Sequence, residues 1–201
     1  MTEANKYTVR LRITIQSILM SMLLLRGIPC PAQEMPIPAE VQYALITKIL
    51  AFDKHLNEAG KRELVIGILF QNGFRMSKTT RDELIAAMEQ SPATNVCGMS
   101  VRFTSIDIDN GLRVSDMISP GRVDALYITP LRAIDIETIV ALSRSRKIIT
   151  LTGVPEYAEE GVAVSIGIRD ERPLIIVNLP AAKAEGADLS SQLLKVSKVI
   201  Q

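Results

Sequence analysis

Hydrophobic and polar positions in this chain alternate between two periods, one typical of strands and one typical of helices. Residues 64–70 are an uninterrupted apolar run, which is typical of a parallel strand buried on both faces. Further runs of strand length are 99–106, 123–129 and 147–151. Apolar residues recur at helical spacing over 41–56, 79–91, 114–118 and 134–143. The pattern predicts a single three-layer α/β domain, with a mostly parallel sheet and helices on both faces.

Local signals place the ends of several helices. Pro38 and Glu40 suit the first turn of the helix over 41–56. Thr79 or Thr80 can cap the next helix, and Ser91-Pro92 stops it. We therefore expect helix and strand to alternate at the spacing of a right-handed α/β layer.

The last quarter of the chain departs from this alternation. Residues 162–168 and 174–177 read as two strands joined by the charged connection 169–172, which predicts an antiparallel pair. Pro180 suits a first helical position, and Gly186 suits the end of that short helix. A final helix, capped by Asp188 or Ser190, is expected to run to Ile200.

The N-terminus has the pattern of an export signal. Lys6, Arg10 and Arg12 precede an uncharged apolar run over 13–25, and Cys30-Pro31-Ala32 offers small residues at a cleavage site. We predict a signal peptide over 1–32 and a mature domain over 33–201. An uncleaved anchor is the second choice, because the run is shorter than the roughly 20 residues that span a bilayer.

Composition excludes some classes of partner. The net charge is +1, and the sequence has no Trp, four Tyr and four Phe. Nucleic-acid-binding domains concentrate basic residues and stack bases on aromatic rings, so we expect no nucleic-acid partner.

Candidate chemistry is sparse. Neither phosphate-loop spacing occurs, and His55 is the sole histidine, so we expect no cofactor, metal or catalytic residue. Asp107-Ile108-Asp109-Asn110-Gly111 begins like a calcium loop but lacks the distant glutamate, which favours a capped turn. Cys97 is expected to be a small buried hydrophobe.

Loops at the carboxyl ends of the strands are the expected binding site, because ligands of open α/β sheets bind there. The candidate residues are Gln71, Asn72, Gly73, Phe74, Thr129, Pro130, Thr152, Gly153, Glu156 and Tyr157.

The C-terminal pattern resembles the YfiR/HmsC-like family of periplasmic regulators. The matching residues are Val177, Asn178, Leu179, Ala181, Ala182, Lys183, Gly186, Ser190, Ser191, Leu193, Leu194, Lys195 and Val199. Residues 150–152, Tyr157-Ala158, Glu160 and Gly161 are similar to the family's preceding strand, loop and glycine corner. Val162 departs from it, because members usually carry a second glycine there.

The resemblance implies an exported, non-enzymatic regulator in the periplasm. Its partner would be a membrane-bound signalling protein, a diguanylate cyclase or a histidine kinase, and a homodimer is compatible with this interpretation. The alternative is a periplasmic protein that binds a small molecule, because 123–127 and the Thr152-Gly153 loop also resemble one lobe of solute-binding proteins.

Overall fold

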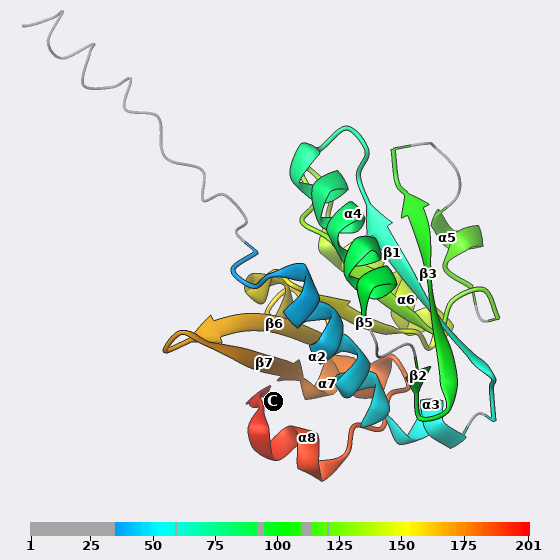
Figure 1. Ribbon diagram of the computed structural model, residues 1–201, viewed down its shortest axis with the longest axis vertical. Coiled ribbons are helices and arrows are strands. Elements are labelled where there is room, and N and C mark those ends of the chain that lie inside the picture. The colour runs from blue at the N-terminus through cyan, green and yellow to red at the C-terminus, as the bar shows by residue number, and fades with distance from the viewer. Residues whose placement is uncertain (1–34, 59, 92–94, 110–113, 120) are drawn as a thin grey trace, which may run out of the picture. The chain divides into compact units, whose positions relative to one another are not determined.

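A single sheet organises the structure, a computed structural model that describes residues 35–58, 60–91, 95–109, 114–119 and 121–201. The strands are β1 (Glu63–Phe70), β2 (Asn95–Val96), β3 (Met99–Asp107), β4 (Ala125–Ile128), β5 (Ile149–Thr152), β6 (Val164–Arg169), β7 (Arg172–Asn178) and β8 (Lys198–Ile200). Their order across the sheet is β2-β3-β1-β4-β5-β6-β7-β8 (Figure 1). The expected leader over 1–32 lies outside the described residues.

The centre of the sheet is parallel, as predicted. β1 pairs in parallel with β3 on one side and β4 on the other, and β4, β5 and β6 follow in parallel. β6 and β7 form the predicted antiparallel pair. Because β3 and β4 lie on opposite sides of β1, the connections diverge there, which makes the β1/β4 boundary a topological switch point.

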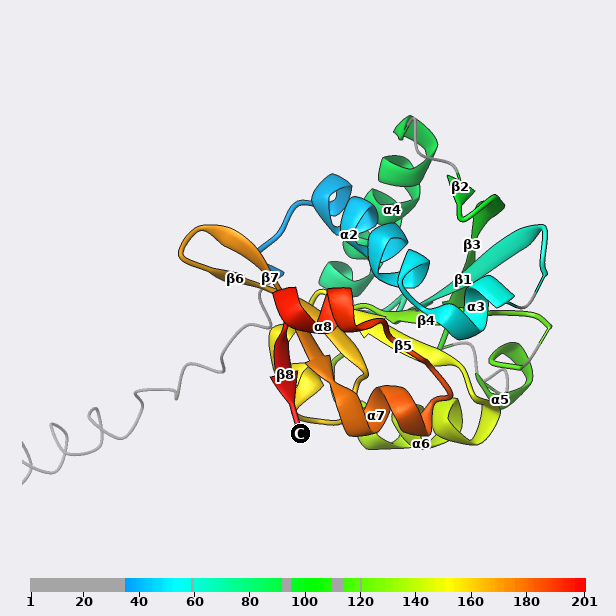
Figure 2. The same cartoon turned by 90° about the horizontal axis from the view of Figure 1, so that it is seen from below.

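Helices cover both faces of the sheet, which confirms the predicted three layers (Figure 2). The helices are α2 (Ala39–Ala51), α3 (Lys54–Glu58), α4 (Arg75–Gln90), α5 (Val114–Met117), α6 (Ile136–Arg146), η1 (Pro155–Ala158, a 3₁₀ turn), α7 (Leu179–Ala184) and α8 (Ser191–Val196). Ile46 of α2 and Leu84 of α4 pack with Ile66 of β1 in one apolar cluster. Ile139 of α6 packs with Leu126 of β4 in the other. None of these helices is long and apolar enough to cross a membrane.

The helix predicted over 41–56 is interrupted at Asp53. Its carboxylate accepts hydrogen bonds from the backbone nitrogens of His55 at 3.0 Å and Asp188 at 3.1 Å. Asp53 also forms a β-bridge with Leu189. The prediction of one helix was wrong because a distant segment of the chain takes hydrogen bonds that would have continued it.

Helix α4 begins four residues before the predicted caps. Its N-cap is Phe74, which offers no side-chain cap, and Thr79 and Thr80 lie within the helix. The Arg81 guanidinium lies over the Phe70 ring, 4.2 Å from its centroid, and this contact joins α4 to the end of β1. The helix therefore begins without the hydroxyl cap that the sequence predicts.

The β6–β7 connection is shorter than predicted. Arg169 and Arg172 pair across the strands, so the turn consists of Asp170 and Glu171 alone. Both have positive φ, +50° and +59°, in a region that favours Asn and Gly. The hairpin extends beyond the neighbouring strands (Figure 1).

The chain ends in a strand rather than in the predicted long helix. Ser190, one of the two expected caps, accepts a hydrogen bond from Leu193 N at 3.5 Å. Helix α8 then ends at Val196, and residues Lys198–Ile200 pair in parallel with β7. Ile200 belongs to this edge strand because β7 offers an open row of backbone groups.

Cys97 is exposed, which contradicts the expectation of a buried thiol. It lies in the tight turn between β2 and β3 with φ +48°. Its sulfur lies 3.7 Å from Ala51 O, and Val96 and Met99 of the two flanking strands are the buried residues.

Candidate functional site

The loops at the carboxyl ends of β1, β4 and β5 meet, as the sequence predicts. Arg132 N donates to Oε1 of Gln71 at 3.0 Å, which joins the loops after β4 and β1. Leu131 N donates to the hydroxyl of Tyr157 at 3.0 Å, which joins the loops after β4 and β5. The hydroxyls of Ser77 and Thr129 lie 2.6 Å apart beneath them. The switch point is therefore closed by hydrogen bonds between its own loops.

Half of the predicted site residues are buried in this closure. Thr129, Pro130, Thr152, Gly153 and Tyr157 are all buried. Thr152 donates to Ile128 O at 2.8 Å, and Thr129 donates to Leu69 O at 2.9 Å. These hydroxyls hold strand ends and are not presented to solvent.

The remaining predicted residues reach the surface. Asn72, Gly73 and Glu156 are exposed, and Gln71 and Phe74 are half-buried. Gly73 N donates to Oδ2 of Asp109 at 2.6 Å. Asp107 Oδ1 accepts from Asp109 N at 3.0 Å, which confirms the capped turn expected for the part of this loop that is described.

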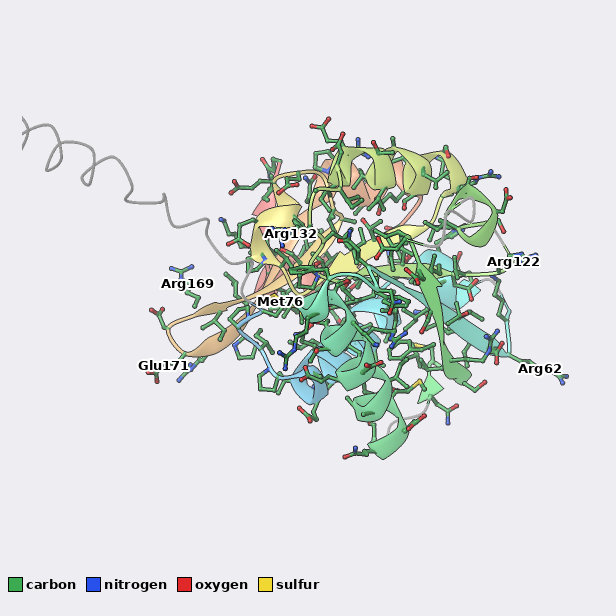
Figure 3. The ribbon with its side chains drawn as sticks, turned by 90° about the horizontal axis from the view of Figure 1, so that it is seen from above. Arg62, Met76, Arg122, Arg132, Arg169 and Glu171 are labelled. Carbon is green, nitrogen blue, oxygen red and sulfur yellow. The ribbon has the colours of Figure 1, made fainter. Side chains whose placement is uncertain are left out.

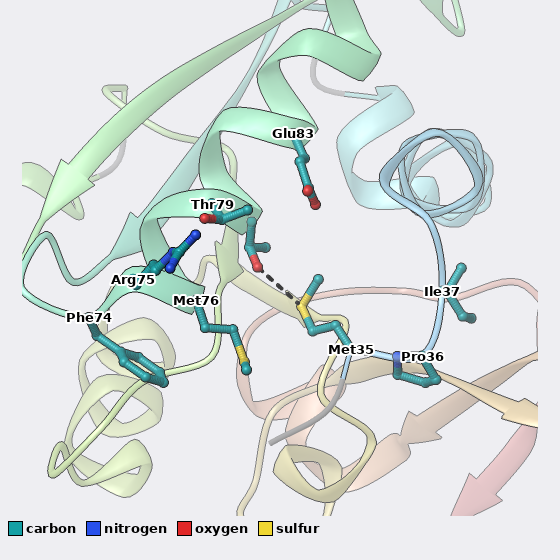
Figure 4. Close-up of a pocket in the computed structure, with 9 residues that line it drawn as sticks. Met35, Pro36, Ile37, Phe74, Arg75, Met76, Thr79 and Glu83 are labelled. Atoms are coloured by element: carbon teal, nitrogen blue, oxygen red, sulfur yellow. Dashed lines mark hydrogen bonds between the residues drawn. The ribbon is translucent and has the colours of Figure 1, made fainter. Parts of the chain in front are cut away.

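An apolar groove of about 650 Å³ opens at this edge, and we call it the α4 groove (Figure 4). It is lined by Met35, Pro36, Ile37, Phe74, Arg75, Met76, Thr79, Thr80 and Glu83. Phe74 is the one predicted site residue in this lining. The segment before α2 forms one wall of the groove, and the first turns of α4 form the other.

Buried polar contacts hold the wall before α2 in place. Gln42 donates to Ile37 O at 2.7 Å and accepts a hydrogen bond from the Tyr127 hydroxyl. Thr80 and Tyr127 each place a hydroxyl 3.8 Å from the sulfur of Met35. Burial raises the pKa of Tyr127, so its hydroxyl remains a donor at neutral pH. Gln42 was not among the residues predicted for the site, and it occupies a buried position on the mostly apolar inner face of α2.

Sequence reasoning also missed the other lining residues of the groove. Met35 and Met76 carry no chemical motif, and only the fold brings them together. The exposed fraction of Met76 is 36%. Methionine adapts to varied binding partners, so Met76 is the lining residue that could have drawn attention to this surface.

A second pocket, of about 740 Å³, lies between α6 and α7. Its lining includes Glu137, Arg144, Glu159 and Glu160. Burial, followed by the nearby carboxylates of Asp135, Glu137 and Glu156, raises the pKa of Glu160. Arg144 donates to Gly161 O at 3.3 Å and occupies one wall.

Neither pocket is lined by a recognisable set of catalytic side chains. Within the described residues, no cluster of three or more His, Cys, Asp or Glu side chains could hold a metal ion. The α4 groove is suited to apolar contact, with charged groups at its margin.

The fold is an open α/β domain, and the α4 groove lies at the carboxyl edge of its sheet. The YfiR/HmsC-like family profile matches residues 39–198, and the chain belongs to this family. No curated protein matches the sequence.

Solved structures with a similar fold include ligand-binding proteins. One is an ABC domain from Streptococcus pneumoniae in complex with L-Trp, with TM-score 0.56 and 19% identity, over 81% of this chain and 60% of that one. A conserved domain protein from Vibrio cholerae O1 biovar El Tor has TM-score 0.55 and 14% identity, over 82% and 60%. A ligand-free, open substrate-binding protein with adhesive properties from Clostridium difficile has TM-score 0.53 and 18% identity, over 78% and 59%. This chain thus matches about 60% of each of these proteins, and the likeness is one of fold.

Proposed function

We propose that this protein is an exported regulator that binds the extracytoplasmic region of a membrane signalling protein and changes its activity without catalysis. The partner class is a diguanylate cyclase, which makes cyclic di-GMP, or a histidine kinase. Membership of the YfiR/HmsC-like family over residues 39–198 carries the proposal, because that family is regulatory.

The surface at the carboxyl edge supports a binding role. The half-buried Phe74 and the exposed Met76 offer apolar area that a partner could bury. Gln42 holds Ile37 O of one wall in place, which reduces the conformational freedom lost on association. Asn72 and Glu156, exposed on the loops after β1 and β5, offer polar groups at the same edge of the sheet.

Regulation of this kind requires a difference in affinity for two states of the partner. A regulator that binds the inactive state about 100-fold more tightly shifts the equilibrium towards it by about 2.7 kcal/mol. Equal affinity for both states would shift nothing, however tight the binding.

A second candidate is a periplasmic binding protein for a small molecule. The similar folds of the L-Trp complex and the substrate-binding protein favour it, and the α4 groove has a volume suited to a small ligand. The family assignment favours the regulator.

Co-isolation from envelope extracts separates the two candidates. The tagged protein, expressed with its leader, should retain a membrane signalling protein through detergent purification. A melting temperature raised by periplasmic small molecules, with no membrane protein retained, would favour the binding protein instead.

A further inference from the structure

Strand β3 leaves one side of its backbone open along most of its length. Its inner side pairs in parallel with β1 from Ser100 to Asp107. Among the described residues, its outer side pairs only with the two-residue strand β2, at Met99 and Ser100. Within the described part of the chain, residues 101–107 therefore have no strand beside them, and we call this stretch the β3 edge.

The register shows which backbone groups lie at the β3 edge. Ser100 N and Ile108 N, at the two ends of the pairing, donate to carbonyls on the β1 side at 3.0 Å. Backbone groups alternate in direction along a strand, so even-numbered residues of β3 point their N–H and C=O groups to β1. Phe103 and Ser105 therefore point theirs to the open side.

The opposite edge of the sheet is protected, whereas the β3 edge is not. Natural edges are commonly blocked by short strands, proline or lysine. At the far end of the sheet, β8 covers β7 at Ile176–Asn178, and Pro173 in the uncovered part of β7 has no N–H. Residues 101–107 contain neither proline nor lysine, and Arg102, their only cation, pairs with Glu63 at 3.1 Å. The β3 edge is therefore available for the addition of a strand.

Side chains on the two faces of β3 determine what an added strand would carry. Arg102 and Thr104 lie on one face and, together with Arg122, line a pocket of about 270 Å³. Arg122 is exposed and has no ion-pair partner among the described residues, so its positive charge is available. The half-buried Phe103 lies on the other face, where its ring meets Tyr43 edge-on with centroids 5.9 Å apart. One face of the β3 edge is therefore basic and the other is apolar.

We propose that the β3 edge binds an extended segment of the partner protein as an additional strand, with acidic residues on the face of Arg102 and Arg122 and apolar residues on the face of Phe103. The open backbone groups of Phe103 and Ser105 select an extended occupant, because another strand continues the ladder. The arginines favour acidic side chains, because opposite charges on neighbouring strands attract. This inference rests on the proposed function in taking the occupant to be a protein.

Hydrogen exchange at single amides, measured by NMR, tests the open edge and its occupant. In the free protein, the N–H groups of Phe103 and Ser105 should exchange at least about tenfold faster than those of Arg102 and Thr104, which β1 protects. A peptide that alternates glutamate and valine over about eight residues should slow exchange at Phe103 and Ser105 about tenfold. A peptide that alternates lysine and valine should bind about threefold more weakly.

Three results would overturn the proposal. One is unchanged exchange at Phe103 and Ser105 with about 1 mM glutamate–valine peptide. Another is equal binding of the two peptides. The third is protection of both amides that rises with protein concentration and needs no peptide, because it would place a second copy at the β3 edge.

Proline at position 105 has a matched control. Ser105→Pro removes an N–H on the open side and leaves the hydrogen bonds to β1, so it should weaken binding of the glutamate–valine peptide about fivefold. Ser105→Ala keeps this N–H and should bind like wild type. An equal loss in both variants would contradict backbone pairing.

Arg122→Glu tests the charge assignment without relying on a proline. The position is exposed, and the substitution should reverse the preference between the two peptides. A preference for the glutamate–valine peptide that is unchanged in Arg122→Glu would contradict the proposal.

Photo-crosslinking in cells separates this inference from the proposed function. The crosslinking residue replaces Ser105 at the β3 edge or Glu171 in the β6–β7 turn. Figure 3 shows Arg122, which lies beside the β3 edge, and Glu171 at opposite ends of the molecule. Capture of a membrane signalling protein through position 105 alone supports both proposals. Capture through position 171 alone, or equally through both, overturns the binding edge and leaves the function standing. Peptide binding as predicted, with no signalling protein captured at either position, supports the binding edge and contradicts the function.

Discussion

At the scale of single residues, buried polar contacts explain why half of the candidate site residues do not reach solvent. Thr152 ends β5 and Tyr157 lies in the turn that follows, at the edge where ligands of α/β proteins bind. The Thr152 hydroxyl, however, donates to Ile128 O of β4, and the Tyr157 hydroxyl accepts a hydrogen bond from Leu131 N in the loop after β4. A sequence shows that such residues lie at the correct edge of the sheet. It does not show whether their polar atoms turn inwards, because that depends on side chains such as Gln42 that come from another element.

Substitution of Gly153 tests how the buried Tyr127–Gln42 pair is packed. A methyl group there would lie 2.7 Å from the Tyr127 hydroxyl, too close for any real contact. Gly153→Ala should lower the free energy of unfolding by about 1–3 kcal/mol, because the buried Tyr127–Gln42 pair must move. Urea denaturation measures this loss. The loss should shrink in a Gln42→Ala background, and equal losses in both backgrounds would contradict the packing described.

Glu185 predicts a dependence of stability on pH. Its carboxylate accepts a hydrogen bond from Thr150 N at 2.7 Å. Burial raises its pKa to about 8, although the Thr150 hydrogen bonds and the charge of Arg144 act in the opposite direction. The folded protein then holds a proton that the unfolded chain has already released above about pH 4.5.

The wild-type protein should therefore lose stability as the pH rises from about 5 to about 8, by at most about 1.4 kcal/mol per pH unit from this group. Glu185→Gln keeps a hydrogen-bonding side chain but does not titrate. It should therefore remove the part of the pH dependence of stability that Glu185 contributes. Denaturation at a series of pH values checks it, and an identical slope in both proteins would refute the assignment.

At the scale of elements, periodicity located the parallel strands and the helices between them. Periodicity gave wrong predictions where long-range hydrogen bonds determine where a helix or strand ends. Asp53 ends the first helix because residues 188–190 pair with it, and Lys198–Ile200 form a strand because β7 lies beside them. Neither partner is close in sequence, so no local pattern could reveal the contacts.

The conformation of the β6–β7 turn is strained, and the sequence reveals this strain once the turn is known to have two residues. Asp170 and Glu171 both take positive φ, where non-glycine residues are strained. Replacing the pair with Asn-Gly should raise the free energy of unfolding by about 1 kcal/mol, because these residues favour a two-residue hairpin turn. Thermal or urea unfolding measures the gain. A loss of stability would mean that the turn differs from the one described.

At the scale of the whole molecule, the chain belongs to the YfiR/HmsC-like family, and export through the predicted leader is a separate prediction. We expect signal peptidase to cleave after Ala32. The intact mass of the protein recovered by osmotic shock should then correspond to residues 33–201. Recovery of the full-length chain from the cytosol would contradict export.

Regulation requires that binding change the partner's activity, and a titration measures this. Membranes that contain the co-isolated signalling protein are assayed for cyclic di-GMP synthesis or for autophosphorylation while the purified processed protein is added. We expect a saturable change in rate, and Met76→Ser should shift its midpoint to about tenfold higher concentration. An unchanged rate at concentrations that saturate binding would mean that the protein does not regulate this partner.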